Sequence, residues 1–312
     1  MNFKGKKVLV AGGTGLIGTP LVKMLIEKED ANVRIASLDD KSRAHPKAEF
    51  FKLDLTKYVN CMVACSGVDF VFNLLCLKGS PKFMKEHPAT AFDVNTDLEN
   101  NMIRAAHQWG IKNYFLTSSI GVYPAAEVFF EDDAVNEKFP SKNDMAAGFA
   151  KCVAEVQARH YMAEYGMVIS IVRPANTYGP LDDFDSEKAM VVPSFIRRAL
   201  GGENPFMARG ASVIRDVIYC EDVARGMLHI AKLEETRPVN LGSGIGYKLS
   251  EILDAVIENL EEKPEIVRED SGLGDKQRVL DISRAKSLGW SPKISLKEGI
   301  KKTMDWYKNQ KK

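Results

Sequence analysis

Short apolar runs alternate with longer amphipathic segments in the first half of the chain. Each short run is rich in β-branched or aromatic residues and is bounded by polar or glycine-containing turns, as strands are. Strands are predicted at Lys7–Ala11, Val33–Leu38, Glu49–Leu53, Asp69–Leu75, Lys112–Thr117 and Met167–Arg173. Helices are predicted between them at Leu16–Lys28, Lys57–Cys65, Pro88–Trp109 and Asp144–Tyr165. This alternation indicates βαβ units, and therefore an α/β fold with a doubly wound parallel sheet.

Glycine and proline punctuate the chain after Arg173. Gly179-Pro180, Gly201-Gly202 and the glycines between 242 and 246 are typical of short elements joined by loops. Two clear helical patterns remain there, Ser194–Leu200 and Leu249–Leu260. We therefore expect a sheet domain over residues 1–175, to which a segment near 212–242 returns, and a smaller C-terminal α/β module made of residues 176–211 and 243–312.

The charges of the chain are balanced, with 43 Lys and Arg against 42 Asp and Glu and a formal net charge of +1. A chain without a basic excess lacks the field that nucleic-acid binding uses, so we predict no nucleic-acid partner. No stretch of about 18 uncharged apolar residues occurs, which predicts no membrane span and a cytoplasmic protein. The five cysteines and five histidines show no close ligand spacing, so we predict no metal site.

Three glycines at a fixed spacing follow the first strand. Gly12, Gly15 and Gly18 lie where the chain passes from that strand into a helix. The first permits a sharp turn, the second lets the backbone approach a pyrophosphate, and the third lets helix and strand pack closely. The N–H groups at the helix N-terminus attract phosphates. We therefore predict a Rossmann-type dinucleotide site in the sheet domain. The further cofactor contacts expected in this turn are Thr14, Leu16 and Ile17.

An acidic residue at the end of the second strand favours NAD over NADP, because it accepts hydrogen bonds from the ribose and repels a 2′-phosphate. Ser37 stands nearest to that place here, and Asp39 follows two residues later. Lys41 and Arg43 could instead hold a phosphate or belong to a solvated turn. We predict NAD, with Asp39 at its ribose, and leave NADP open.

Further motifs are spread over nearly the whole chain. They are Asp54-Leu55, Thr117-Ser118-Ser119-Ile-Gly-Val122-Tyr123, Gly148-Phe-Ala-Lys151, Arg173-Pro-Ala-Asn176-Thr-Tyr178-Gly179-Pro180, Ile214-Arg215-Asp216-Val-Ile-Tyr219 and Leu288-Gly289-Trp290-Ser-Pro292. Together with the glycine turn they resemble the extended short-chain dehydrogenase/reductase family, and in particular its nucleotide-sugar epimerases, dehydratases and reductases. We expect Asp54 and Leu55 at the adenine and Leu75 among the other cofactor contacts.

The resemblance implies a redox reaction at C4 of a sugar. A tyrosine removes the hydroxyl proton while a hydride passes to the nicotinamide, and a lysine four residues later lowers the tyrosine pKa and binds the nicotinamide ribose. A Ser or Thr hydrogen-bonds the reacting oxygen. Ser119 and Lys151 match the last two roles, but the tyrosine position is Ala147, whose methyl group moves no proton.

Three explanations of Ala147 stay open. The chain oxidises its substrate with another base or a water, or it has lost redox chemistry and kept a binding or regulatory role, or the alignment at this position is shifted. We favour the first, because the substrate-binding positions remain intact. The sequence does not rank the candidate bases, which are Tyr123, Glu131, Asp132 and Asp144.

The segment after Arg173 is similar to that of GDP-fucose synthase and other GDP-sugar enzymes. The resemblance implies that Asn176 holds the diphosphate and that Val192 lines the guanine pocket. Arg215 and Arg278 carry the planar guanidinium that suits diphosphate oxygens. The smaller module is therefore expected to bind a nucleotide sugar, with GDP favoured.

Three assignments in this region have structural alternatives. Arg215 could pair with Asp216 or Glu221. Arg198 is a weaker candidate for binding the diphosphate and is more simply a charge on a helix surface. Lys78 follows the fourth strand at the carboxyl edge of the sheet, where ligands bind. It touches the sugar or belongs to an ordinary polar loop.

These observations together predict NAD-dependent oxidation of a GDP-hexose or GDP-heptose at C4 to a 4-keto sugar. A nucleotide-sugar epimerase with a transient 4-keto intermediate is the near alternative, and a catalytically silent NAD-binding regulator is an alternative of another class. The resemblance also implies a homodimer, in which Pro88–Trp109 and Asp144–Tyr165 of two chains form a four-helix bundle, although apolar stripes on these helices also suit an internal core.

Overall fold

A seven-stranded parallel sheet forms the centre of the computed structural model, which describes residues 1–134, 139–142, 144–185, 187–270 and 275–310. Its strand order is β12-β7-β5-β4-β1-β2-β3. The strands are β1 (Lys7–Ala11), β2 (Asn32–Ser37), β3 (Glu49–Lys52), β4 (Phe70–Asn73), β5 (Asn113–Thr117), β7 (Val168–Pro174) and β12 (Val239–Leu241). The doubly wound fold and its six predicted strands are confirmed. The seventh strand, β12, was missed because three residues are too short for a periodic pattern.

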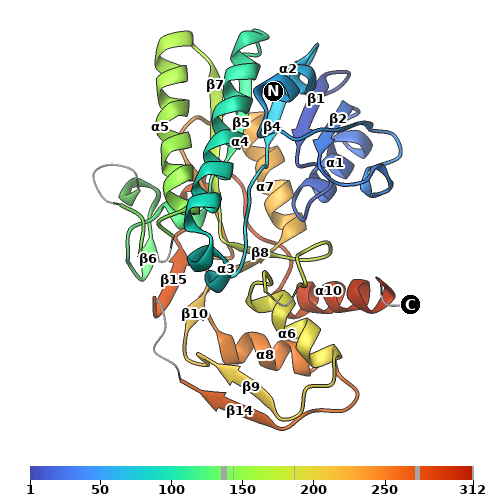
Figure 1. The fold of residues 1–312 in the computed structure, drawn as a ribbon, viewed down its shortest axis with the longest axis vertical. Helices are drawn as coiled ribbons and strands as arrows, with labels where there is room; N and C mark the ends of the chain where they lie inside the picture. The colour runs from blue at the N-terminus through green and yellow to red at the C-terminus, as the bar shows by residue number, and fades with distance from the viewer. Residues whose placement is uncertain (135–138, 143, 186, 271–274, 311–312) are drawn as a thin grey trace.

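Helices cover both faces of this sheet (Figure 1). One face carries α2 (Tyr58–Cys65), α4 (Pro88–Gln108) and α5 (Ala147–Tyr165), and the other carries α1 (Gly18–Glu27) and α7 (Cys220–Leu233). Successive strand residues point to opposite faces of the sheet. Val71 of β4 therefore packs in the apolar core under α2, α4 and α5, and Phe72 packs in the core under α1 and α7. The sheet is therefore buried on both sides, as parallel sheets are.

Helix α5 begins three residues later than predicted, at Ala147 instead of Asp144. Its first turn packs so closely on the short 3-10 helix η2 (Ile120–Val122) that a Cβ on Gly148 would lie 2.2 Å from the Gly121 carbonyl oxygen. Helix α3 (Pro81–Glu86) replaces part of the loop expected after β4, and the Ser80 hydroxyl accepts a hydrogen bond from Phe83 N at 3.2 Å at its start. A six-residue helix is too short to be recognised from periodicity.

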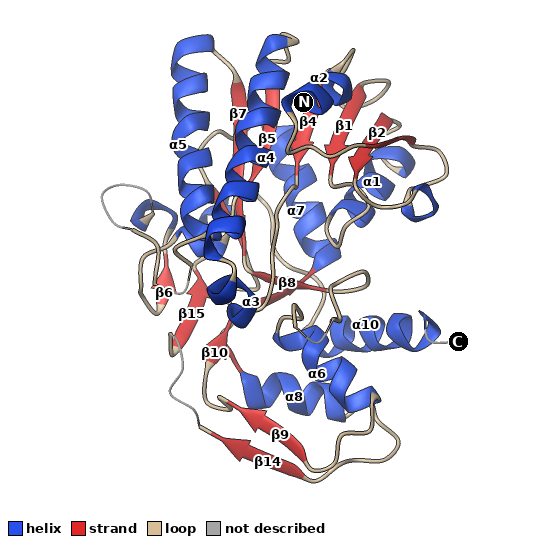
Figure 2. Ribbon diagram, in the orientation of Figure 1, coloured by secondary structure: helices blue, strands red, loops and turns tan. Residues whose placement is uncertain are grey.

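The smaller module lies below the sheet in Figure 2, around a third apolar core. This core is formed by α6 (Val191–Leu200), α8 (Leu249–Ile257) and α10 (Leu296–Gln310). Beside them lies the parallel pair β9 (Phe206–Arg209) and β14 (Ile266–Glu269), whereas the short helix α9 (Ser283–Ser287) packs against β12 of the large sheet. Helices α7 and α10 were not predicted, although both carry apolar residues at helical spacing.

Two small sheets join the module to the large one. The first pairs β8 (Asn176–Tyr178) with β11 (Val217–Tyr219). The second has the order β13-β10-β15-β6, and its strands are β13 (Tyr247–Lys248), β10 (Ile214–Arg215), β15 (Gln277–Leu280) and β6 (Val128–Phe129). Because β6 comes from the first half of the chain and β15 from the second half, this sheet joins distant parts of the sequence. The described helices include none with the length and apolar character needed to cross a membrane.

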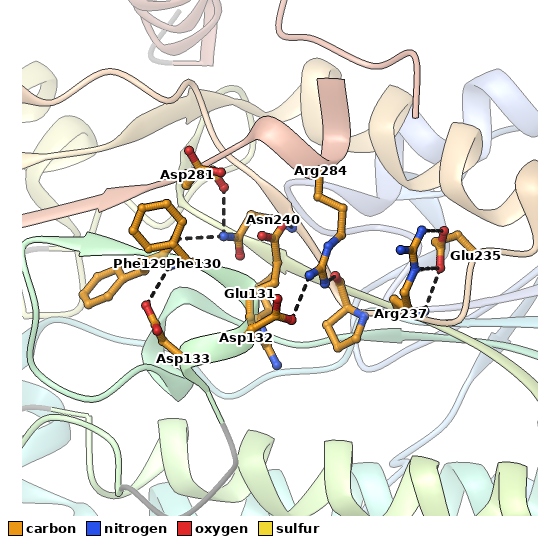
Figure 3. A network of polar contacts seen from close by, with 12 residues as sticks. Phe129, Phe130, Glu131, Asp132, Asp133, Glu235, Arg237, Asn240, Asp281 and Arg284 are labelled. Atoms are coloured by element: carbon orange, nitrogen blue, oxygen red, sulfur yellow. Dashed lines mark hydrogen bonds and ion pairs between the residues drawn. The ribbon is translucent and has the colours of Figure 1, made fainter. Parts of the chain in front are cut away.

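Asn240 of β12 ties this second sheet to the large one (Figure 3). Its amide nitrogen donates to the Phe129 carbonyl at 3.1 Å and to the Asp281 carbonyl at 2.9 Å. Its backbone N–H donates to Glu131 Oε1 at 3.0 Å. Nearby, Arg284 donates to Asp132 at 2.8 Å. The segment from Phe129 to Asp132 is thus fixed to the edge of the large sheet by these polar contacts.

Arg173 of β7 carries the most buried positive charge of this region. Its guanidinium pairs in bidentate fashion with Glu155 of α5, at 2.8 Å and 2.6 Å, and also donates to Tyr123 Oη at 3.0 Å and to the Glu131 carbonyl at 2.7 Å. Arg173 and Glu155 are each 1% exposed. Neither charge has access to water, so each depends on the other.

Replacing Arg173 with methionine should therefore destabilise the protein by about 3–5 kcal/mol, because Glu155 would stay buried without its cation. Urea unfolding of Arg173→Met measures this loss. The control is Arg237→Met, which removes a guanidinium that is 66% exposed and paired with Glu235 at 2.8 Å. Exposed pairs contribute at most about 1 kcal/mol, so equal losses in the two variants would contradict the prediction.

Candidate active site

The carboxyl ends of β1 and β4 meet at the point where the strand order reverses. Strand β1 pairs with β2 on one side and with β4 on the other. Open α/β sheets bind ligands at such a switch point. A Cβ on Gly12, after β1, would lie 3.5 Å from the Leu74 carbonyl oxygen and 3.6 Å from Leu75 Cδ2. The predicted cofactor residues Gly12 and Leu75 are thus neighbours across this point.

The glycine turn has the shape that its spacing predicts. Gly12 has a φ of +81°, in the region that favours glycine. A Cβ on Gly18 would lie 2.3 Å from the Gly12 carbonyl oxygen, so helix and strand touch there. A Cβ on Gly15 would meet only that same oxygen, at 3.4 Å, and otherwise open space. No side chain caps the start of α1. The turn therefore offers room and N–H donors where a pyrophosphate would bind.

Asp39 lies against the glycine turn despite its late position in the sequence. Thr14, which is buried, donates its hydroxyl hydrogen to Asp39 Oδ2 at 2.6 Å and lies 2.7 Å from Ser37 Oγ. Arg43 pairs with the other oxygen of Asp39 at 2.9 Å. A carboxylate therefore lies against the glycine turn, and Arg43 is engaged by it.

Other predicted cofactor residues serve packing or turns. Leu16 and Leu55 are 9% and 2% exposed and belong to apolar cores, so only their backbone atoms can meet a cofactor. Ile17 precedes the first residue of α1 and packs partly on a core. Asp54 accepts hydrogen bonds from the Thr56 hydroxyl at 2.7 Å and from Thr56 N at 3.0 Å, and these hold the pKa of Asp54 below its usual value.

Lys151 reaches from α5 to the ends of two strands. Its ammonium donates to the Leu75 carbonyl at 3.0 Å, to the Thr117 carbonyl at 2.8 Å and to the Glu99 carboxylate. A lysine has three N–H donors, so all are in use. A hydrogen bond from Lys151 to a nicotinamide ribose would replace one of these three, and the bond to Leu75 is the longer of the two to carbonyls.

Glu99 of α4 was missed by the sequence analysis. It is 3% exposed, and its second oxygen accepts a hydrogen bond from Asn73 Nδ2 of β4 at 2.7 Å. Burial lowers the pKa of Lys151, but the charge and hydrogen bond of Glu99, together with smaller contributions from Cys76 and Glu155, leave the pKa above its usual value. The signal in the sequence was a carboxylate within the apolar face of a predicted helix, directly after Leu98.

Ser119 stands at the end of β5, beside the start of α5. Its hydroxyl accepts a hydrogen bond from Gly121 N at 3.0 Å and so begins η2. Ala147 is the first residue of α5, one turn before Lys151 on the same helix. The structure therefore brings Ser119, Ala147 and Lys151 to one edge of the sheet, as predicted, and supplies no phenol at the tyrosine position.

Three of the four candidate bases are engaged elsewhere. Tyr123 is fully buried, donates to Asn240 Oδ1 at 2.6 Å, and has its pKa raised by burial. Glu131 is also buried and accepts a hydrogen bond from the Asn240 backbone. Asp132 is exposed and pairs with Arg284 (Figure 3). None of these three is free to accept a proton beside Ser119.

The fourth candidate, Asp144, lies beside the Ser119 turn. A Cβ on Gly121 would lie 3.4 Å from Ser119 Oγ and 3.5 Å from Asp144 Oδ1. The other oxygen of Asp144 is 2.5 Å from Arg278 Nη1. Asp144 thus joins the reacting edge of the sheet to a predicted phosphate-binding arginine.

Arg215 and Arg278 are partners in the parallel register of β10 and β15. Arg278 also donates to the Ile120 carbonyl at 3.1 Å, and its Nε is buried without a partner among the described residues. Arg215 donates to the Asp275 carbonyl at 2.9 Å. Burial, followed by the charge of Arg278, lowers the pKa of Arg215. Two cations therefore lie side by side next to the Ser119 turn.

One substrate prediction, Val192, and one structural alternative, the pairing of Arg215 with Asp216, need correction. Val192 is 2% exposed and packs in the third core, so its side chain does not line a pocket surface. Asp216, offered as a partner for Arg215, accepts hydrogen bonds from Ser243, Gly244 and Leu280 instead. These hydrogen bonds satisfy the oxygens of the buried carboxylate, which would otherwise be costly to bury.

Asn176 and Lys78 lie between the sheet and the module. Asn176 donates its side-chain N–H to the Asp216 carbonyl at 2.9 Å. Lys78 pairs with the buried Asp182 at 2.6 Å, and burial raises the pKa of Asp182. Arg198, as its structural alternative required, pairs with Glu203 at 2.5 Å and not with a site group. The loop after β4 is thus fixed to the module by an ion pair.

A dinucleotide-binding fold with a glycine turn at its switch point defines the class of this protein. Residues 8–242 match the model of the NAD dependent epimerase/dehydratase family. The chain belongs to this family, which confirms its resemblance to the extended short-chain dehydrogenase/reductases, and it is an NAD-dependent enzyme.

Individual relatives agree with this assignment. The chain is 30% identical to a putative UDP-glucose 4-epimerase of Methanocaldococcus jannaschii, over 97% of this chain and 98% of that protein. It is 29% identical to GDP-mannose 3,5-epimerase of Arabidopsis thaliana, over 97% of this chain and 82% of that protein. Among solved structures, UDP-glucose 4-epimerase of Thermus thermophilus in complex with NAD is similar, with a TM-score of 0.82 and 26% identity, covering 97% of this chain and 99% of that one.

Replacing Gly15 with alanine should weaken NAD binding about 5- to 100-fold, because the new methyl group would fill the open space over the turn at a cost of roughly 1–3 kcal/mol. Isothermal titration calorimetry with NAD measures the loss. The free protein should unfold at an unchanged temperature, since the Cβ meets only one atom, at 3.4 Å. Gly18→Ala is the contrasting variant, because its Cβ collides with the backbone and should lower that temperature. Unchanged NAD affinity in Gly15→Ala would refute the assignment of this turn.

Proposed function

We propose that the protein oxidises the C4 hydroxyl of a nucleotide-activated hexose or heptose to a 4-keto sugar, with GDP as the favoured nucleotide. NAD, when bound, supplies the acceptor for the hydride. The chain supplies Ser119 to bind the reacting hydroxyl and Lys151 to hold positive charge at the nicotinamide end of the groove. Arg215 and Arg278 bind the diphosphate.

One observation carries this proposal most directly. Arg278 comes from the smaller module, yet it bonds the Ile120 carbonyl, one residue after Ser119. A diphosphate on Arg278 would therefore hold its sugar beside the hydroxyl of Ser119. The preference for GDP rests on the motif after Arg173 and on the similarity to GDP-mannose 3,5-epimerase over nearly the whole chain.

Epimerisation is the second candidate, because the named relatives include epimerases of both UDP- and GDP-sugars. An epimerase oxidises the sugar and reduces it again before release, so NADH does not accumulate. A dehydrogenase leaves one NADH for each sugar oxidised. Net NADH formation therefore separates the two reactions.

The enzyme, loaded with NAD and mixed with a panel of GDP-, UDP- and dTDP-sugars, should gain NADH absorbance with a GDP-sugar, up to one NADH per active site. The same mixtures analysed by mass spectrometry should contain a sugar two hydrogen atoms lighter. A product isomer without NADH would favour epimerisation. Bound NAD with no change for any sugar would instead favour a silent regulator.

We also propose that the enzyme forms a homodimer through α4 and α5. These helices lie side by side in Figure 1, and Gln157 Nε2 donates to Asn100 Oδ1 between them at 2.5 Å. Val153 and Val156 are each 39% exposed on α5, around a shallow pocket that Thr96 and Asn100 of α4 also line. An apolar face of this kind suits a second copy of the same pair of helices. The five free cysteines suit the cytoplasm, where we place the enzyme.

Changing Val153 and Val156 together to aspartate should convert the dimer to monomer, because two charges would be buried against the partner copy. Sedimentation velocity reports the change. The matched control changes Val59 and Val63 of α2, which are 66% and 48% exposed, to aspartate and should leave a dimer. A monomeric unmodified protein would disprove the interface.

A further inference from the structure

We propose that Asp144 is the base that replaces the missing tyrosine, and that Arg278 holds it until the diphosphate of the substrate takes the arginine over. This inference rests on the proposed function and adds the group that receives the proton and the step that frees it.

The position of Asp144 is fixed by the chain around it. Its carbonyl oxygen accepts a hydrogen bond from Gly148 N at 2.8 Å, so the helical turn of α5 reaches back to it. Gly148 in turn touches the Gly121 backbone, where no larger residue fits. Asp144 stands three residues before Ala147, in the turn that leads into α5. The carboxylate therefore replaces the phenol from one turn upstream.

The carboxylate shares a small space with Ser119. The hydroxyl oxygen of Ser119 and Oδ1 of Asp144 lie 3.4 Å and 3.5 Å from the Cβ position of Gly121, which has no side chain. A sugar hydroxyl entering between these two oxygens meets a hydrogen-bond donor on one side and an acceptor on the other. Glu99, a buried carboxylate of the same region, is bound by Lys151 and Asn73 and is not free to act as a base.

In the free protein the guanidinium of Arg278 forms an ion pair with the carboxylate of Asp144. Its Nη1 lies 2.5 Å from Asp144 Oδ2, and it is 3.8 Å from Asp275. Arg215, its strand partner, bonds only carbonyl oxygens among the described residues. The two guanidinium groups thus lie near the carboxylates of Asp144 and Asp275, and a diphosphate brings two negative charges that can replace Asp144 at Arg278. Arg278 exchanges Asp144 for the diphosphate, which leaves Asp144 free only when substrate is present.

The reaction then balances with the cofactor already assigned. The C4 hydroxyl would lose its proton to the Asp144 carboxylate, and carbon C4 would lose its hydrogen, as hydride, to NAD. A ketone and NADH are formed, and the O–H and C–H bonds of the alcohol are broken. The side chain of Asp144 is 27% exposed, so the proton passes from it to water.

The test compares the Asp144→Asn variant with the unmodified enzyme, in single turnovers of the NAD-loaded protein with the GDP-sugar that forms NADH. Loss of a general base slows such a step about 10²- to 10⁴-fold, so we expect a loss in this range. Calorimetry with GDP alone should show about two- to fivefold tighter binding, because the diphosphate no longer displaces a carboxylate from Arg278. A merely structural role would not tighten GDP binding.

Two further variants make the outcome decisive. Asp254→Asn removes an aspartate that pairs with Arg268 at 2.6 Å elsewhere in the module, and should change neither quantity. Adding Ala147→Tyr to Asp144→Asn should restore part of the rate, because a phenol would then stand four residues before Lys151.

Three results would overturn the inference. The first is a rate for Asp144→Asn within about threefold of the unmodified enzyme, since the loss of a base slows the step far more. The second is weaker GDP binding in that variant, and the third is no recovery of the rate when Ala147→Tyr is added. If the unmodified enzyme forms no NADH with any nucleotide sugar, the proposed function itself fails and the base assignment with it. NADH formed equally fast by both proteins would overturn only the inference.

Discussion

The buried ammonium of Lys151 fixes the geometry of the whole site. It bonds the backbone at the ends of β4 and β5 and pairs with Glu99 of α4, so that two strands and two helices meet at one charge. Lys151 is only 2% exposed, so water cannot solvate its charge. These protein partners therefore have to stay in place. The glycine turn lies next to this junction through Leu75, and Ser119 follows Thr117 by two residues. The glycine turn and the Ser119 turn therefore share one rigid support.

A second charge arrangement stands on the substrate side. Arg278 bridges the smaller module and the Ser119 turn, and in the free protein it is neutralised by Asp144. Arg215 and Arg278 lie in register on neighbouring strands, where their like charges disfavour each other. A pair of cations held this close is relieved by a divalent anion more than by a single carboxylate. In the free protein the carboxylates of Asp144 and Asp275 face these two cations, and the proposed release of Asp144 requires that a diphosphate take its place at Arg278.

The sequence could predict the features that depend on neighbouring residues. The glycine turn is such a feature, because the positive φ of Gly12 and the contact between Gly18 and Gly12 arise within seven residues. Six of the seven strands of the large sheet were predicted from their apolar runs, and Ser119 and Lys151 from motifs. Glu99 was not predicted, because its partner Lys151 is 52 residues away and the pattern of α4 shows only a polar residue on an apolar face. Val192 was misplaced for a similar reason, since a motif does not show which side of a helix packs inward.

The sequence by itself thus determined the α/β fold, the dinucleotide turn and the absence of the tyrosine at position 147. Only the tertiary structure decided which acid stands beside Ser119, because Ser119, Asp144 and Arg278 come from distant parts of the chain. Arg278 and Ile120, which are 158 residues apart, touch there. Backbone dihedral angles and side-chain periodicity are set locally and can be read along the chain. Proximity between charges that are distant in sequence depends on how the sheet, α5 and β15 pack. This packing distinguished Asp144 from the other candidate bases, which are Tyr123, Glu131 and Asp132.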